Sequence, residues 1–435
     1  GSHLGGRLAD AGRVPLSRIL VAAGFCGALP VLGSGVPILA REVFGFIPGA
    51  VVTAAILFAP PVVCLGAVVP FLVQADTESL DSVGRRAGDL SAAATAGSIL
   101  GSFVTGFFLL PAMPLPLLLG LTAAALLAMA GLAARVLGGR VEKVQVAAGM
   151  ILLPTLGLMG SGLPPDRIHS EQTLYSAVEV TEREWADGRR VRELWQNGGS
   201  SSAEYVESGL PAHVYATASL EMLRPVIERA NEVLVLGGAA LTLPVAFTQA
   251  NPDARIDVVE IDPVVTSLAS RFFAFGDADR PAITVIHDDA RLVLRDGTES
   301  YDLIYLDVFD HLLTVPWTMV TEEALSDMAR RLAPSGVFAA NVLSPLEGPG
   351  SEFLARFRAT LERVFPASRV YRASPSLRLG ATQNLIVIAA SSEEALPAVD
   401  APLAPVLAGG RPLTDAWAPV EYLQAKVFMQ GLRWN

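Results

Sequence analysis

Long uncharged runs in the first third of the chain constrain its fold more than any other feature. About 20 apolar residues are enough to cross the hydrocarbon core of a bilayer. Four runs of at least that length contain no Asp, Glu, Lys or Arg: Ile19 to Ala40, Val43 to Ala75, Leu90 to Ala134 and Val144 to Pro165. The third run is long enough for two spans and is interrupted by three prolines, so the sequence predicts about five transmembrane helices over residues 18–165.

Charge is distributed very differently in the remainder of the chain. Residues 1–160 hold nine of the 32 basic and seven of the 43 acidic residues, which leaves 23 basic and 36 acidic residues for the rest. An apolar first third followed by an acidic remainder predicts a membrane domain joined to a soluble one. The acidity disfavours nucleic acid as a partner and suits cationic ligands, although it also serves solubility alone.

The apolar runs carry no ionisable side chain, which a proton or ion pathway would need at depth. We therefore expect them to act as an anchor or to form an apolar pocket. Gly97 and Gly101 lie on a small-residue face that suits either an ordinary helix contact within the chain or a homodimer contact. The cysteines, Cys26 and Cys64, lie inside apolar runs and offer neither a disulfide framework nor a metal site.

The direction of insertion stays open at this stage. Gly1-Ser2-His3 resembles a tag remnant, so residues 1–17 are interpreted as that remnant plus an N-terminal segment, and the natural start is expected to be missing. Placing every basic loop in the cytoplasm would send the soluble domain outside after a fifth span. A nucleoside cosubstrate would instead require a cytoplasmic domain.

The stretch from Asn231 to Asp262 organises the soluble part. Val233 to Leu236 reads as a buried parallel strand, Gly237-Gly238 ends it, and a helix is expected near Leu243-Pro244. A second strand, Ile256 to Val259, leads into Glu260. This βαβ unit places a glycine turn after one strand and an acid after the next, which suits a ligand with two ribose hydroxyls.

Two further strand ends also carry acids. Ile283 to Ile286 leads into Asp288-Asp289, and Leu303 to Leu306 leads into Asp307 and Asp310. Because the carboxyl ends of parallel strands meet at one edge, these acids are expected to surround a polar ligand. The motifs VLVLGG, VVEIDP, IHDDAR and LIYLDVFD resemble the spermidine synthase (aminopropyltransferase) family from about Thr173 onward. The apolar part resembles the membrane segment of multi-span bacterial members.

The resemblance implies a fold and a set of roles. It implies a multi-pass protein of the bacterial inner membrane, with a Rossmann-like, methyltransferase-type, doubly wound domain over residues 231–435 and a small β-hairpin layer with a linking helix over 166–230. Gly237 and Gly238 would begin the glycine loop, Glu260 would bind ribose, and Asp289 and Ala290 would lie beside the adenine amine. The implied cosubstrate is decarboxylated S-adenosylmethionine, or S-adenosylmethionine, with no metal.

The same resemblance assigns the acceptor side. Asp307 matches the acid that removes a proton from the attacking amine, and Asp310 matches a substrate-binding acid. Tyr175 and Tyr215 match tyrosines of the substrate site. A structural role as a strand-end cap remains the alternative for both aspartates.

The chain departs from the family at three places. Ala239, Ala240 and Leu241 replace the glycine-aspartate-glycine that continues the loop, Ser176 replaces a glutamine, and Ala216-Thr217 replaces a histidine-glutamate pair. His213, His287 and His311 are expected to be solvated loop histidines. The sequence therefore favours a membrane-anchored aminopropyltransferase acting on an amine such as putrescine. A methyltransferase and a non-catalytic nucleoside-binding protein are the alternatives.

Overall fold

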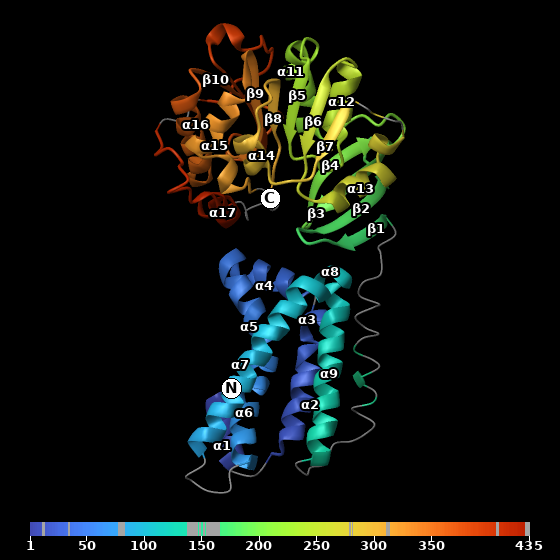
Figure 1. Ribbon diagram of the computed structural model, residues 1–435, viewed down its shortest axis with the longest axis vertical. Coiled ribbons are helices and arrows are strands. Elements are labelled where there is room, and N and C mark those ends of the chain that lie inside the picture. The colour runs from blue at the N-terminus through green and yellow to red at the C-terminus, as the bar shows by residue number, and fades with distance from the viewer. Residues whose placement is uncertain are drawn as a thin grey trace. The chain divides into compact units, whose positions relative to one another are not determined.

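The computed structural model describes residues 1–10, 14–33, 35–76, 83–136, 147, 149–150, 153, 166–277, 280, 282–309, 314–405 and 409–430. The chain forms two compact units, Gly1–Leu163 and Pro164–Asn435 (Figure 1). The first unit is helical throughout its described part, and the second combines two β-sheets with helices.

The helices of the first unit are α1 (Ser2–Asp10), α2 (Leu16–Gly27), α3 (Leu29–Leu32), α4 (Val36–Phe44), α5 (Phe46–Gly66), α6 (Val68–Asp76), α7 (Val83–Val104), the π-helical turn Thr105–Leu109, α8 (Leu110–Ala112) and α9 (Leu115–Val136). Among the described residues, three helices are long and apolar enough to cross a membrane: Pro48–Gln74, Gly84–Leu109 and Leu115–Val136. They coincide with the second, third and fourth spans expected from the sequence.

The first expected span is not one straight helix. Leu16–Leu32 and Val36–Phe44 meet at an angle of 72°, so they form either one broken span or a re-entrant pair. The glycines flanking this break account for it, since they add little helix stability. The fifth expected span, Val144 to Pro165, lies almost wholly outside the described residues.

The second unit begins with a four-stranded antiparallel sheet in the order β1-β2-β3-β4. Its strands are β1 (Arg167–Gln172), β2 (Ala177–Glu184), β3 (Arg190–Gln196) and β4 (Gly199–Tyr205). The expected hairpin is β2 and β3, which turn at Asp187-Gly188. The prediction of a hairpin layer was incomplete, because β1 and the Ser-rich β4 lack the alternating apolar pattern on which strand prediction depends.

The larger sheet has seven strands in the order β10-β11-β9-β8-β5-β6-β7. Its strands are β5 (Glu232–Leu236), β6 (Arg255–Val259), β7 (Ile283–Ile286), β8 (Tyr301–Leu306), β9 (Leu332–Ser344), β10 (Ala367–Arg372) and β11 (Gln383–Ala390). Strands β7, β6, β5, β8 and β9 pair in parallel, whereas β11 pairs antiparallel with both β9 and β10. The order reverses between β5 and β8, which makes their carboxyl ends the expected ligand edge.

Helices cover both faces of this sheet, as Figure 1 shows. One apolar core packs α11 (Val214–Ile227), α12 (Thr242–Ala250) and α13 (Pro263–Phe272) against one face. The other packs α14 (Ala290–Asp296), α15 (Glu322–Arg330), α16 (Glu352–Val364) and α17 (Val420–Gln430) against the opposite face. Because alternate side chains of each strand enter different cores, the central strands read as continuous apolar runs. The Rossmann-like, doubly wound arrangement predicted from the sequence is therefore confirmed.

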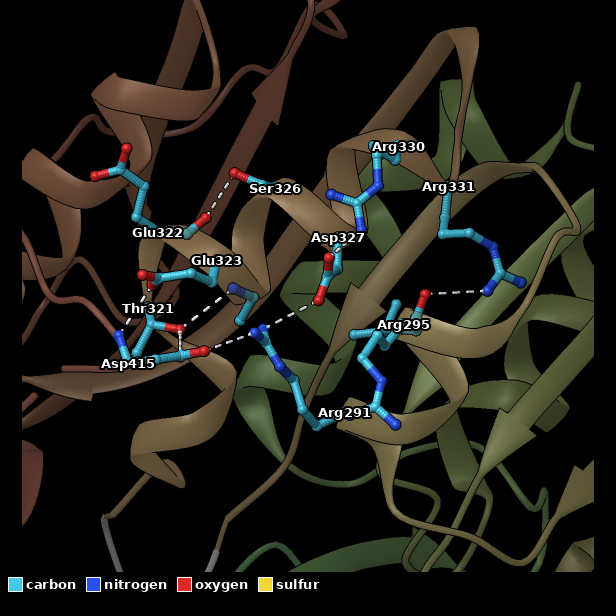
Figure 2. Close-up of polar contacts among 12 residues, drawn as sticks. Arg291, Arg295, Thr321, Glu322, Glu323, Ser326, Asp327, Arg330, Arg331 and Asp415 are labelled. Atoms are coloured by element: carbon cyan, nitrogen blue, oxygen red, sulfur yellow. Dashed lines mark hydrogen bonds and ion pairs between the residues drawn. The ribbon is translucent and has the colours of Figure 1, made fainter.

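A polar network holds the start of α14, which follows one of the predicted nucleoside-binding positions (Figure 2). The Thr321 side chain caps α15 by accepting a hydrogen bond from the Ala324 amide, and its hydroxyl donates to Asp415 over 2.6 Å. Arg291, the second residue of α14, contacts Asp415 at 3.0 Å and Asp327 at 3.4 Å. The C-terminal segment thus ties α14 to α15.

Candidate active site

A cavity of about 760 Å³ lies at the carboxyl ends of the central strands. Its walls come from the residues that follow β5, β6, β7 and β8, from β9 and β11, and from the four-stranded sheet and the start of α11. The reversal of strand order between β5 and β8 opens the edge of the sheet at this point. The strand order of the sheet therefore brings residues that are far apart in the sequence to one cavity.

Gly237 makes the first turn possible. Its φ is +94°, and a Cβ built there would lie 2.4 Å from the Asp307 carbonyl oxygen. Its amide donates to the Val259 carbonyl over 2.9 Å. A side chain at this position would push the loop after β5 away from the loop after β8, so only glycine fits.

Glu260 holds the glycine loop from the neighbouring strand end. Its Oε2 accepts hydrogen bonds from the Gly238 and Ala239 amides at 3.1 and 2.9 Å, and its Oε1 accepts one from the Asp262 amide at 3.0 Å. Burial raises the pKa of Glu260, and these three amides oppose that rise. Three of the four acceptor positions of this carboxylate are therefore occupied. The loop uses most of this capacity, and the role of Glu260 as a ribose ligand stays a prediction.

Asp262 supplies a further acceptor beside Glu260. Its Oδ1 caps α13 by accepting from the Val264 amide over 3.0 Å. The residue is 1% exposed, and its Oδ2 has no hydrogen-bond partner in the described part of the chain. Together with the free position on Glu260, this gives two acceptors on the wall that follows β6.

The end of β7 contributes two exposed acids to the same wall. Asp289 caps α14 by accepting from the Arg291 amide over 2.7 Å, and Asp288 accepts from the Asp289 amide over 2.7 Å. Both line the cavity, as does Ala290. The capping role leaves one Asp289 oxygen for a ligand.

Asp307 follows β8 and sits at the centre of a hydrogen-bonded chain. Its Oδ2 accepts from the Tyr215 hydroxyl at 3.1 Å, and its Oδ1 accepts from the Asn341 amide nitrogen at 2.9 Å. Asn341 in turn accepts from Asn384 at 3.0 Å. Burial raises the pKa of Asp307 to about 6, although the two hydrogen bonds oppose that rise. The group is therefore mostly ionised at pH 7 and is a stronger base than an ordinary aspartate.

Sequence reasoning missed Asn341 and Asn384. Asn341 is 3% exposed and lies in the middle of β9, whose neighbouring residues are almost all apolar. A polar residue inside an apolar strand is an available signal, because buried polar groups need partners. Asn384 stands at the start of β11 and carries no comparable signal in the sequence.

The wall formed by the four-stranded sheet and α11 carries neutral polar side chains. Tyr175 lies in the turn before β2 and is 53% exposed. His213 is half-buried at the start of α11 and lies 3.0 Å from the Ser200 hydroxyl, which corrects the expectation of a solvated loop histidine. His287 is exposed and lies 3.1 Å from Thr266. His311 is outside the described residues.

The structure brings every described candidate to this one cavity: Tyr175, Tyr215, Gly237, Gly238, Glu260, Asp289, Ala290 and Asp307. Their roles stay predictions. Asp310, the remaining predicted substrate contact, lies outside the described residues. Among the described residues, no group of three or more His, Cys, Asp or Glu side chains could hold a metal ion.

Comparison with protein families gives the site its setting. Residues 215–378 match the spermine/spermidine synthase domain. The chain contains a spermine/spermidine synthase domain. That domain holds the central strands and most of the walls described above.

Individual relatives fall into two groups. The chain is 29% identical over 189 residues to a polyamine aminopropyltransferase of Vibrio vulnificus, covering 41% of this chain and 59% of that protein. It is 30% identical over 172 residues to the human eEF1A lysine and N-terminal methyltransferase, covering 37% of this chain and 24% of that protein. The chain therefore has relatives of both kinds, and it spans 59% of the first protein and 24% of the second.

A solved structure is also similar. A probable spermidine synthase from Corynebacterium glutamicum superposes with a TM-score of 0.45 and 23% identity, covering 53% of this chain and 82% of that one.

We expect Gly237→Ala to disrupt the site. A residue with a β-carbon loses about 1–3 kcal/mol of folding stability when it adopts this left-handed backbone conformation, and the clash with the Asp307 carbonyl oxygen adds to that loss. Gly188→Ala is the matched control, because Gly188 has φ +80° but open space around it. All five tryptophans lie after residue 184, so tryptophan fluorescence during urea unfolding of the full chain in detergent reports on the second unit. Equal destabilisation by both substitutions would contradict the close approach.

We expect Asp307→Asn to stabilise the protein at neutral pH. The folded-state pKa of Asp307, about 6, lies above its ordinary value of 3.8, so folding favours the protonated form. Stability from this group is therefore full below pH 4 and is lost as the pH rises through 6. The variant should exceed the wild type by about 1–2 kcal/mol at pH 8, with the difference vanishing near pH 4.

The control for this measurement is an aspartate whose pKa is shifted in the opposite direction. Asp296 is exposed, and its hydrogen bond from Arg295 lowers its pKa. Asp296→Asn should therefore not stabilise the protein at pH 8. A destabilised Asp307→Asn variant at that pH would show that the hydrogen-bonded network outweighs the desolvation of its carboxylate.

Proposed function

We propose that the chain is a membrane-anchored aminopropyltransferase that moves an aminopropyl group from decarboxylated S-adenosylmethionine to an amine such as putrescine. One observation carries the proposal: the charge of the cavity wall. Five carboxylates line it, Glu260, Asp262, Asp288, Asp289 and Asp307, and the described lining contains no Lys or Arg. Such a wall favours cationic ligands, and both the decarboxylated donor and an amine are cations.

The donor would occupy the side of the cavity formed by the glycine loop and the ends of β6 and β7. Glu260 and Asp262 together offer two acceptors for the ribose diol, and the turn at Gly237 lets the ligand approach the backbone. Asp289 and Ala290, which line the same side of the cavity, would contact the adenine amine. Ile261, 42% exposed between the two acids, would be covered by the ring.

Asp307 would act on the acceptor. The amine lone pair attacks the carbon attached to the sulfonium, a C–N bond forms, and the C–S bond breaks with its electron pair going to sulfur. The product is a neutral thioether, methylthioadenosine, and the proton lost by the nitrogen goes to the Asp307 carboxylate. Tyr215 and Asn341 hold that carboxylate in one orientation. Burial raises the pKa of Tyr215 well above its ordinary value of 10, so its hydroxyl keeps its proton and remains a donor.

A methyltransferase is the second candidate. Its supporting observation is Ala240, which stands where the family has the aspartate of its glycine-aspartate-glycine loop and which packs instead into an apolar cluster with Val178 and Leu268. Without that acid the loop repels a donor carboxylate less. The lack of Lys or Arg in the described lining still argues against a carboxylate-bearing donor.

The nucleoside product separates these candidates. Purified full chain is incubated with either donor and a mixed amine pool, and the released nucleoside is identified by mass spectrometry. We expect methylthioadenosine from the decarboxylated donor, with Asp307→Asn slower by about 10²–10⁴. Release of S-adenosylhomocysteine would favour the methyltransferase, and no product from either donor would favour a non-catalytic protein.

The pH dependence gives a sharper test of the base. Below pH 6 both Asp307 and the amine must lose a proton, so log kcat/KM should rise by about two per pH unit. Above pH 6 only the amine titrates, and the slope should fall to about one. Asp307→Asn should follow the slope of one throughout. A wild type without the bend near pH 6 would remove Asp307 as the base.

We also propose that the first unit spans the bacterial inner membrane several times and keeps the second unit in the cytoplasm, where nucleoside cosubstrates occur. Three described helices of spanning length, with an apolar surface largely exposed to solvent, support the first part. The chain should sediment with membranes, resist extraction by carbonate at high pH, and require detergent. Recovery of monodisperse full chain from a detergent-free lysate would contradict the proposal.

A further inference from the structure

A chain of hydrogen bonds in the four-stranded sheet leads to His213 at the cavity wall. Arg183 of β2 forms an ion pair with Glu193 of β3 at 2.8 Å. Glu193, which is 2% exposed, accepts from the Ser200 hydroxyl at 3.0 Å, and Ser200 lies 3.0 Å from Nε2 of His213. The catalytic step described above uses none of these residues.

This chain fixes the tautomer of His213. Glu193 accepts hydrogen bonds from Arg183 and from the Ser200 hydroxyl, which uses its single proton for this bond. The Ser200 oxygen can then only accept from His213, which places the ring proton on Nε2. Burial lowers the pKa of His213, with the charge of Glu193 partly opposing, so the neutral ring is favoured. Its Nδ1 is left as a free acceptor, since it has no partner in the described part of the chain.

The free acceptor lies close to the proposed base. The rings of His213 and Tyr215 are 5.7 Å apart between centroids, and the Tyr215 hydroxyl reaches Asp307. His213, Ser200, Tyr215 and Asp307 all line the same cavity. One tyrosine ring therefore separates the two groups that can accept protons or hydrogen bonds from an acceptor substrate.

We propose that Nδ1 of His213 accepts a hydrogen bond from a second donor group of the acceptor amine, so that the site selects amines carrying an N–H or O–H group distant from the reacting nitrogen. This inference rests on the proposed function and names the acceptor class. A neutral imidazole accepts from a hydroxyl and an ammonium alike, whereas an acceptor ending in a methyl group would leave Nδ1 buried without a partner. Selection by this group is thus for a donor rather than for a second positive charge.

Two substitutions separate the two ring nitrogens. In His213→Gln the side-chain amide nitrogen can replace Nε2 as donor to Ser200, and nothing replaces Nδ1. In His213→Asn the shorter amide can place its oxygen near the position of Nδ1 while losing Ser200. His169→Gln is the matched control, because His169 pairs with Glu171 in β1 and does not line the cavity.

The measurement is binding of three four-carbon amines to the full chain with methylthioadenosine present, by calorimetry. The wild type should bind 4-aminobutan-1-ol and 1,4-diaminobutane more tightly than 1-aminobutane. His213→Gln should weaken the first two by about 3–10-fold, as expected for one neutral hydrogen bond, and leave 1-aminobutane unchanged. His213→Asn should retain part of the preference, and His169→Gln all of it.

Three results would overturn the inference: equal weakening of all three amines by His213→Gln, no preference in the wild type, or no amine binding at all. Because the assay reads binding, it does not depend on turnover. A wild type that shows the His213-dependent preference but forms no methylthioadenosine would refute the aminopropyl transfer and leave the acceptor selection intact.

Discussion

The carboxylate of Glu260 is the contact on which the rest of the site depends. It lies at the end of β6 and accepts hydrogen bonds from two amides of the loop after β5 and from one amide of its own turn. Isolated loop amides would otherwise face an empty cavity, where an unpaired buried donor costs about 1–3 kcal/mol. The bond also holds Ala239, whose φ of +43° is unfavourable for a residue with a side chain. The side chain of Glu260 therefore holds the glycine loop after β5 in the shape that lines the cavity.

The second constraint is the cost of burying Asp307. Its neighbours supply two hydrogen bonds, yet the balance still raises its pKa to about 6. Asp307 therefore binds its proton more tightly in the folded protein than an ordinary aspartate does, which makes the group a better proton acceptor. Tyr215 and Asn341 limit the penalty without abolishing it. The burial that makes ionisation of Asp307 unfavourable also makes its carboxylate a stronger base.

The sequence predicted the central fold well because its signals were local. Short apolar runs ending in glycine or acid located β5, β6, β7 and β8, and the common edge of parallel strands brought Glu260, Asp289 and Asp307 together. Strands β1 and β4 were missed because polar residues such as Ser200–Ser202 do not alternate with apolar ones. Asn341 and Asn384 were missed because the contact of Asn341 with Asp307, and that of Asn384 with Asn341, arise from strand order, which no local pattern encodes. His213 was misjudged for the same reason, since its surroundings come from β3 and β4.

The cavity is walled by two sheets that share part of one apolar core, and this has a consequence for engineering. The seven-stranded sheet provides the acids that follow β6, β7 and β8, and the four-stranded sheet provides the neutral groups that face them. The two walls meet at Tyr215, whose hydroxyl bridges Asp307 and the Ser201 carbonyl. Because Val178 and Val180 of β2 pack in one cluster with Ala240 and Val265, replacing the four-stranded sheet would also disturb the loop after β5. The two walls of the cavity therefore have to be redesigned together.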